Sequence, residues 1–265
     1  MVLVSHRYRF VYLKTHKTAS TSVEVMLEPL CLPEGTVTAR SHRRDAEITE
    51  AGIVGVRGGP RRGVEERVWR NHAPAATVRR ALGRARFCDY LKIAAIRNPW
   101  DRAVSAFSSD LTGGERSRLG RQPFDAATEQ FRAWLRTATL DQNLAQLTAS
   151  GRPCIDALLV FERLEADVAA LFARLSAMPT GALPRLKGDR RLFPERPFQD
   201  WYDARARARV ARANWYEIAL AGYDFDMPAP REEPLPWPHH AWLDRPLLRW
   251  HLQWRAPPGG ARLTP

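Results

Sequence analysis

The chain has 265 residues, of which 45% are apolar, and its 41 lysine and arginine residues outnumber 29 aspartate and glutamate residues to give a net charge of +12. This size allows one large α/β domain or two small ones, and the lack of an apolar run of about 18 residues predicts no membrane span. Three widely separated cysteines without a CxxC pair argue against a disulfide framework or a zinc site. Because the N-terminal residues lack the apolar segment of a signal peptide, we expect a reducing, cytoplasmic setting.

Nearly all of the excess positive charge comes from arginine. The guanidinium group matches the geometry of phosphate, sulfate and carboxylate oxygens, so anionic partners are expected. Nucleic acid would also fit the charge. However, the arginines are scattered, and no helix-turn-helix, zinc-finger or ribonucleoprotein (RNA-recognition) motif occurs. We therefore expect no nucleic-acid partner, and a general bias of composition toward arginine accounts for part of the excess.

The first predicted unit is a buried strand over 10–13, a hydroxyl-rich loop and a helix that begins near Thr21. Thr21 and Glu24 fit a capping box at the start of this helix. Backbone N–H groups, the positive end of the helix dipole and the Lys17 ammonium would converge there on one anion. Both glycines of the nucleotide P-loop pattern are missing. The candidate anion-binding residues are Lys17, Thr18, Ala19, Ser20, Thr21 and Ser22.

The next segment, 33–67, is rich in glycine, arginine and proline and has little periodicity, which predicts a long loop. A basic loop close to an anion site fits a substrate lid, and a disordered insertion fits equally well. Residues 74–86 read as a short helix with Pro74 near its start. Residues 90–96 read as a second buried strand.

A second oxyanion clamp is predicted where this strand runs into RNPWDRAVSAF. Asn98 and Pro99 fit the cap and the first position of a helix. Arg97 would lie at the carboxyl end of the strand, where open α/β sheets bind ligands. Arg102 and Ser105 share a helix face by their spacing. This second clamp favours anion binding over the simpler interpretation of the first loop, which is a capped helix beside a solvated lysine.

The rest of the chain continues the alternation of helices and strands until its character changes at residue 227. Nine of the 20 prolines and four of the nine tryptophans lie beyond that point, which predicts a tail separate from the preceding domain. We therefore predict one domain over 1–226, including the long loop, and a Pro/Trp-rich tail over 227–265. The remaining predicted elements are helix over 124–149, a strand over 155–161, an amphipathic helix over 162–175, a loop over 179–198 and helix over 201–221.

The two clamps together resemble the cofactor motifs of the sulfotransferases that use 3′-phosphoadenosine 5′-phosphosulfate (PAPS). In that family a lysine–threonine loop before a helix binds the 5′-phosphosulfate, and an RNP stretch followed by serine binds the 3′-phosphate. The sequences KTASTS and RNPWDR are most similar to the carbohydrate (type 2) branch, particularly glycan 2-O-sulfotransferases, and the similarity spans about residues 8–226. It implies an α/β, P-loop-like three-layer fold with a central, mostly parallel sheet flanked by helices.

The resemblance also implies a role for each motif residue. Lys17 would neutralise the leaving oxygen, the loop would hold the 5′-phosphate, and Arg97 with Ser105 would hold the 3′-phosphate. PAPS would donate its sulfuryl group to a hydroxyl of an acceptor, with a carbohydrate, including an acidic glycan, as the expected class. No metal is needed. Glycan 2-O-sulfotransferases carry a catalytic histidine in an interval comparable with that of His72, which is our choice of base; His16, beside the cofactor loop, is the alternative.

Two other functions fit parts of the sequence. A nucleotide kinase would use a similar strand–loop–helix site, would need ATP and Mg²⁺, and would need an acidic metal ligand, for which Glu162 is the candidate. A polyanion-binding or nucleic-acid-binding protein would bind in a salt-dependent manner and would ignore PAPS. The sequence does not indicate the oligomeric state.

Overall fold

The computed structural model describes residues 1–36, 45–57, 67–140, 143–186, 190–226 and 230. The predicted tail over 227–265 therefore lies almost wholly outside the described residues, as do parts of the predicted loop over 33–67. Within the described part of the chain, no helix is both long enough and apolar enough to cross a membrane.

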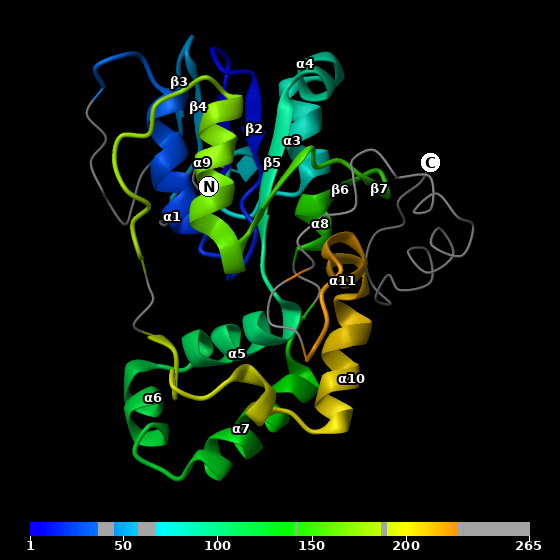
Figure 1. The fold of residues 1–265 in the computed structure, drawn as a ribbon. Coiled ribbons are helices and arrows are strands. Elements are labelled where there is room, and N and C mark those ends of the chain that lie inside the picture. The colour runs from blue at the N-terminus through cyan, green and yellow to red at the C-terminus, as the bar shows by residue number, and fades with distance from the viewer. Residues whose placement is uncertain (37–44, 58–66, 141–142, 187–189, 227–229, 231–265) are drawn as a thin grey trace.

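A six-stranded sheet forms the centre of the upper part of the molecule in Figure 1. Strands β2, β5 and β8 are parallel neighbours, β1 is antiparallel to both β2 and β4, and β3 is antiparallel to β4. Strands β2, β4, β5 and β8 thus run in one direction, which makes this a mixed, mostly parallel sheet. In sheet order the strands are β3 (Glu47–Ile48), β4 (Gly52–Val54), β1 (Leu3–Ser5), β2 (Phe10–Tyr12), β5 (Leu91–Ile96) and β8 (Ala157–Val160).

Helices cover both faces of this sheet because its strands are apolar on both sides. In β2, Phe10 and Tyr12 pack on the face covered by α1 (Ser20–Leu27) and α9 (Leu164–Arg174), with η1 (Glu28–Cys31) nearby. Val11 points to the opposite face, where α3 (Ala75–Leu82) and α8 (Leu144–Leu147) lie. Each such buried large side chain contributes about 1.5–3 kcal/mol. The predicted arrangement of a central sheet flanked by helices is confirmed.

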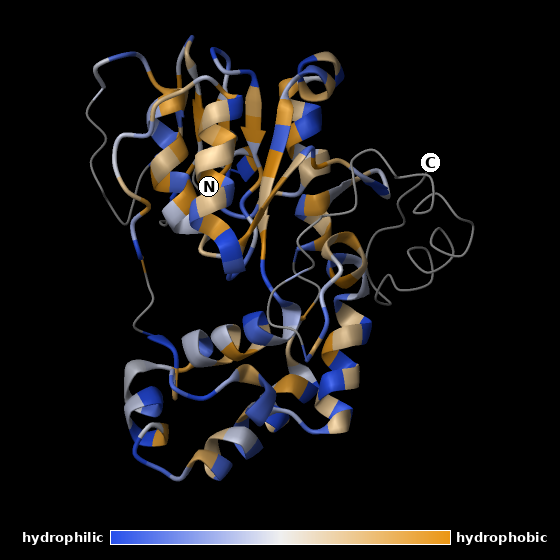
Figure 2. Cartoon of the chain, viewed as in Figure 1, coloured by the Kyte–Doolittle hydropathy of each residue, from blue (hydrophilic) through white to orange (hydrophobic). Residues whose placement is uncertain are grey.

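A second group of helices lies below the sheet in Figure 1, with α5 closest to the strands. Its core is aromatic: Phe107, Phe131 and Trp201 contact one another edge to face. Figure 2 shows the same division, with apolar strands above and helices of mixed polarity below. The elements are α5 (Pro99–Asp110), α6 (Gly113–Leu119), α7 (Phe124–Thr137), η4 (Phe198–Trp201), α10 (Ala204–Ala213) and α11 (Trp215–Ala221).

Most predicted elements form, but three of the predicted helices are interrupted or end early. The helix over 74–86 divides at Gly83, whose φ of +85° favours glycine, into α3 and α4 (Arg84–Asp89). The helix over 201–221 divides at Asn214, and the helix over 124–149 ends at Thr137. Three short elements complete the described chain: β6 (Thr148–Ala149), β7 (Arg152–Pro153) and η2 (Phe161–Arg163).

The segment predicted as a loop over 33–67 contains the hairpin β3–β4, which the sequence did not predict. Its strands have two and three residues, too short for a visible alternation of polar and apolar side chains. The hairpin requires glycine at position 52, because a Cβ there would lie 2.1 Å from the Val4 carbonyl oxygen. The hairpin forms because β1 supplies its partner.

Candidate active site

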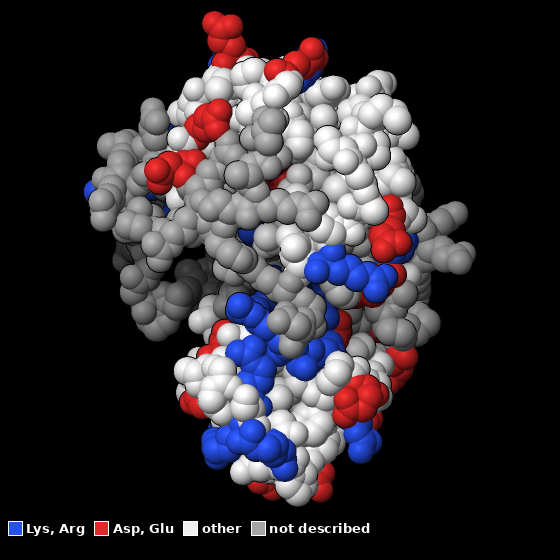
Figure 3. Space-filling view, turned by 90° about the vertical axis from the view of Figure 1, so that its left-hand side faces the viewer, with Lys and Arg blue, Asp and Glu red and all other residues white. Residues whose placement is uncertain are grey.

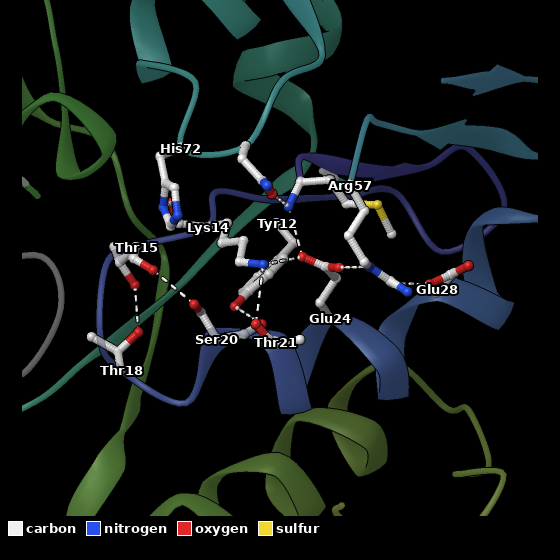
Figure 4. Close-up of polar contacts among 12 residues, drawn as sticks. Tyr12, Lys14, Thr15, Thr18, Ser20, Thr21, Glu24, Glu28, Arg57 and His72 are labelled. Atoms are coloured by element: carbon white, nitrogen blue, oxygen red, sulfur yellow. Dashed lines mark hydrogen bonds and ion pairs between the residues drawn. The ribbon is translucent and has the colours of Figure 1, made fainter. Parts of the chain in front are cut away.

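The loop between β2 and α1 is held by hydrogen bonds among its own hydroxyl groups (Figure 4). Thr15 Oγ1 donates to the Ala95 carbonyl oxygen at 2.5 Å and lies 2.8 Å from Thr18 Oγ1. Ser20 Oγ donates to the Thr15 carbonyl oxygen at 2.7 Å. Thr15, Thr18 and Ser20 are buried, so these hydroxyl groups fix the shape of the loop and tie it to β5.

The start of α1 differs from the prediction. The helix begins at Ser20, one residue before the predicted start, and its cap position, Ala19, has a left-handed φ of +53° and provides no side-chain cap. The predicted capping box of Thr21 and Glu24 is therefore wrong. Lys17 is also left-handed, with a φ of +59°. Two non-glycine residues thus adopt the backbone that glycines usually supply, each at a cost of about 1–2 kcal/mol. The first N–H groups of α1 lie beside them, and among these Ser22 N is already bonded to the Ala19 carbonyl oxygen at 2.8 Å.

The second motif forms as predicted at the junction of β5 and α5. Asn98 Oδ1 caps the helix by accepting from Trp100 N at 3.0 Å and Asp101 N at 3.4 Å, and Pro99 is the first helical residue. Arg97 follows the last residue of β5. Its guanidinium group donates to the Lys17 carbonyl oxygen at 3.4 Å and lies 4.0 Å from the ring centre of Phe161. The two predicted clamps, which are 80 residues apart in sequence, therefore meet in space.

A carboxylate that the sequence did not single out holds the Arg97 side chain. Asp101, one turn into α5, accepts from Arg97 Nε at 2.7 Å and pairs with Arg191 through its other oxygen. Burial acts to raise the pKa of Asp101, but the two guanidinium groups outweigh it and lower that pKa. Two arginines from distant segments are thus gathered around one anion at the start of α5.

The other two residues of the predicted clamp have different surroundings. Ser105 is half-buried on α5, two turns after Arg97. Arg102 does not turn toward the clamp: it pairs with Glu217 of α11 at 3.1 Å, donates to the Leu140 carbonyl oxygen at 3.3 Å and bonds with Asn214. The prediction that Arg102 belongs to the oxyanion clamp is therefore wrong, because α11 supplies a buried carboxylate that the spacing within α5 cannot reveal.

The two candidate bases lie against each other. The rings of His16 and His72 stack with their centres 3.5 Å apart and their planes 17° apart, and His72 Nδ1 is 3.1 Å from the Lys14 carbonyl oxygen. Burial, and then nearby cations and the neighbouring ring, lower the pKa of His72 to about 2. Burial, with Arg102, Lys14 and Lys17, lowers the pKa of His16 to about 4. Both rings are therefore neutral near pH 7.

Comparison with known proteins agrees with this geometry. The sequence model of the sulfotransferase family matches residues 1–185, a range that contains both clamps and both histidines. The chain belongs to the sulfotransferase family. It is therefore an enzyme of the class that transfers sulfuryl groups. No curated protein and no solved structure matches the chain at a significant level.

Behind the β2–α1 loop, the sulfotransferase contains a buried cluster of charges (Figure 4). Glu24 accepts from Lys14 Nζ at 2.7 Å and pairs with Arg57, which also pairs with Glu28. The Met1 amino group lies 2.6 Å from Glu24. Burial acts to raise the pKa of Glu24, but the cations lower it to about 2. Glu24 is therefore not a cap but an anion that ties the strand end before the loop to the helix after it.

The sulfotransferase also has a pocket beside the β2–α1 loop. Its volume is about 280 Å³, including space open to solvent. The pocket lies between the loop, one face of α5 and the end of α7. The lining residues are His16, Lys17, Pro99, Arg102, Ala103, Ala106, Trp134, Thr139, Leu140 and Asn214.

Proposed function

We propose that this sulfotransferase transfers the sulfuryl group of PAPS in line onto a hydroxyl of a carbohydrate. The observation that supports the proposal is the contact between Arg97 and the Lys17 carbonyl, because it brings together the two motifs that would hold the 3′-phosphate and the 5′-phosphosulfate. Bound PAPS supplies the activated sulfuryl group. The concentration of lysine and arginine across the middle of the face in Figure 3, between the sheet and the lower helices, also favours an anionic ligand.

The cofactor loop would act in the manner of a P-loop, through its backbone. The hydroxyl groups of Thr18 and Ser20 already take part in the loop's own bonds, so the N–H groups of Ala19 to Thr21 would hold the 5′-phosphate, with Ser22 beside them. The Lys17 ammonium would stabilise the negative charge that builds on the leaving oxygen. Arg97 and the Ser105 hydroxyl would hold the 3′-phosphate, with Arg97 aimed by Asp101.

His72 would take the proton of the acceptor hydroxyl at its Nε2 atom. Its Nδ1 faces a carbonyl oxygen, which can only accept, so Nδ1 must carry the ring proton and leave the lone pair on Nε2. A pKa of about 2 makes His72 a weak base in the free protein. A bound anionic ligand would raise that pKa, because negative charge favours the imidazolium form. His16, stacked on the same ring, is the alternative base.

The pocket beside Lys17 supports a carbohydrate acceptor. Trp134 offers an aromatic surface on which the apolar face of a sugar ring could pack, and its Nε1 is held by Asp110 at 3.2 Å. Thr139 adds a hydroxyl group to the lining of the pocket. An acidic glycan is one class of acceptor that the basic surface in Figure 3 would attract.

The proposal is tested by ligand binding followed by turnover. 3′-Phosphoadenosine 5′-phosphate (PAP) at 100 times its dissociation constant should stabilise the protein by about 2.7 kcal/mol, whereas ATP with Mg²⁺ should have a smaller effect. Labelled PAPS offered with neutral sugars, acidic glycans and phenols should label a sugar hydroxyl, also in the presence of EDTA. Stabilisation by ATP and Mg²⁺ alone would favour the kinase. Indifference to both nucleotides, with salt-dependent binding of polyanions, would favour a binding protein.

A further inference from the structure

One short helix holds the backbones of both stacked histidines. Asn143 is the residue before α8, and Gln146 lies one turn further, so their side chains share a face of the helix. Both are almost completely buried, with 0% and 3% of their surface exposed. Buried side-chain amides are uncommon unless they make specific hydrogen bonds.

Asn143 binds the His16 backbone on both of its polar sides. Its Oδ1 accepts from His16 N at 2.7 Å, and its Nδ2 donates to the His16 carbonyl oxygen at 3.5 Å. The amide thereby pairs with His16 much as a neighbouring strand would. This pairing fixes the residue that directly precedes the left-handed Lys17.

Gln146 performs the corresponding task at the other histidine. Its Nε2 donates to the His72 carbonyl oxygen at 2.8 Å, while His72 Nδ1 binds the Lys14 carbonyl. His72 has a φ of +54°, a left-handed backbone that costs a non-glycine residue about 1–2 kcal/mol. A conformation of this kind persists where surrounding contacts hold it in place.

Packing alone does not explain Gln146. Its Oε1 is buried and has no hydrogen-bond partner within the described part of the chain. A buried, unsatisfied acceptor costs about 1–3 kcal/mol, and an apolar side chain of the same length would avoid that cost. The contribution of the Gln146 amide is therefore its Nε2 donor, which binds the His72 carbonyl oxygen.

We propose that Asn143 and Gln146 are positioning residues that fix the His16–His72 stack, so that Nε2 of His72 faces the acceptor hydroxyl. The expected effect of these two residues on turnover rests on the proposed function. The amides do not touch donor or acceptor. They act by holding two backbone segments that are 56 residues apart in the numbering of the chain.

Gln146→Met tests the proposal, because it removes the donor and keeps an unbranched side chain. Gln199→Met is the matched control, since Gln199 Nε2 also donates to a backbone carbonyl, that of Phe225 at 3.1 Å, in the lower group of helices. We expect kcat of Gln146→Met to fall about 10- to 100-fold with an unchanged KM for PAPS, as misplacement of a reacting group would cause. The control should retain its kcat. Equal kcat values in the two variants, or a loss confined to the KM for PAPS, would overturn the proposal.

A readout that needs no turnover separates this inference from the proposed function. NMR titration of the His72 ring in the ligand-free protein, with its signals assigned by comparison with His72→Gln, should show a depressed pKa in the wild type. In Gln146→Met the pKa should move toward the ordinary value of 6.5 as the stack loosens, and in Gln199→Met it should not. If the His72 pKa moves in Gln146→Met but the wild-type protein transfers no sulfuryl group, the positioning role of Gln146 is supported and the proposed function is refuted. An unmoved pKa in Gln146→Met, or in Gln146→Ala if the first variant does not fold, would refute the inference.

Discussion

The loop between β2 and α1 and the guanidinium group of Arg97 face the same space, but they are held there by different means. The loop is fixed by buried hydroxyl bonds and, behind it, by the charges around Glu24. Arg97 is held by a largely buried ion pair with Asp101, by the ring of Phe161 and by the Lys17 carbonyl oxygen. The loop therefore depends on several buried groups of the fold, whereas Arg97 depends on the contacts of one side chain.

Because of this difference, substitutions in the three places should each reduce a different property: turnover, stability of the fold or binding of the nucleotide. Removing a group that faces the reacting atoms should affect turnover and leave the fold intact. Removing a charge from behind the loop should affect the stability of the fold. Removing the Arg97 side chain should affect the binding of the nucleotide. The variants below test this separation.

The largest loss should follow Lys17→Ala. Without the ammonium beside the leaving oxygen, kcat should fall about 1,000-fold, as for the removal of a strong electrostatic stabiliser. The melting temperature should stay close to that of the wild type. Lys17→Arg, which keeps a positive charge, should retain part of the activity, and steady-state kinetics with labelled PAPS compare the three proteins. A Lys17→Ala enzyme with near-normal kcat would remove Lys17 from the mechanism.

Glu24→Gln should damage the fold instead. The change leaves Lys14 and Arg57 buried without a matching anion, which should lower the free energy of unfolding by about 3–5 kcal/mol. Chemical denaturation measures this loss, with Glu129→Gln at an exposed position as the control. A loss as small as that of the control would show that the cluster does not stabilise the loop.

The same residue predicts a pH dependence. The pKa of Glu24 is about 2 in the folded protein and 4.5 ordinarily, so its ion pairs stabilise the fold above pH 4.5. That stability is lost as the pH falls from 4.5 toward 2. The difference in unfolding free energy between wild type and Glu24→Gln should therefore shrink over that range, and a constant difference would contradict the assigned charges.

His72→Ala should lower kcat about 100-fold, the lower end of the range for a general base, without weakening PAP binding. The same substitution at His16 distinguishes the two stacked rings. Turnover that survives His72→Ala but not His16→Ala would assign the base to His16. Loss of PAP binding in either variant would mean that the ring supports the cofactor loop instead of the acceptor proton.

The smallest loss should follow Arg97→Ala. A charge-assisted hydrogen bond contributes about 1.5–3 kcal/mol, so affinity for PAP should fall about 10- to 100-fold while the fold persists. Asp101→Asn keeps the shape of the residue that aims Arg97 and should cost less. Calorimetric titration with PAP compares both variants with the wild type, and an Arg97→Ala affinity equal to that of the wild type would place the 3′-phosphate elsewhere.

Much of the scaffold could be predicted from short stretches of sequence. The apolar runs predicted β2, β5 and β8, and Asn98 with Pro99 predicted the start of α5, because these signals are local. The hairpin β3–β4 could not be predicted, because its short strands depend on pairing with β1. The division of the last predicted helix at Asn214 likewise depends on tertiary contacts, one of them with Arg102.

The candidate site was predictable only in part, for the same reason. Lys17 and Arg97 stand in recognisable motifs, and the structure brings them into contact. The partners of Glu24 are 10, 23 and 33 residues away along the chain, so the pattern with Thr21 suggested a cap that does not form. Nothing in the sequence indicated that His16 and His72 stack, since their contact depends on how two loops are held.

The central claim is that two clamps hold opposite ends of one nucleotide. Calorimetric titration of the wild-type protein with PAP, with adenosine 5′-phosphate and with adenosine 3′-phosphate tests it directly, since each of the last two lacks one phosphate. The account predicts that PAP binds at least about tenfold more tightly than either, because each phosphate adds charge-assisted hydrogen bonds. If PAP bound no more tightly than adenosine 5′-phosphate, Arg97 would not hold the 3′-phosphate and the account would be wrong.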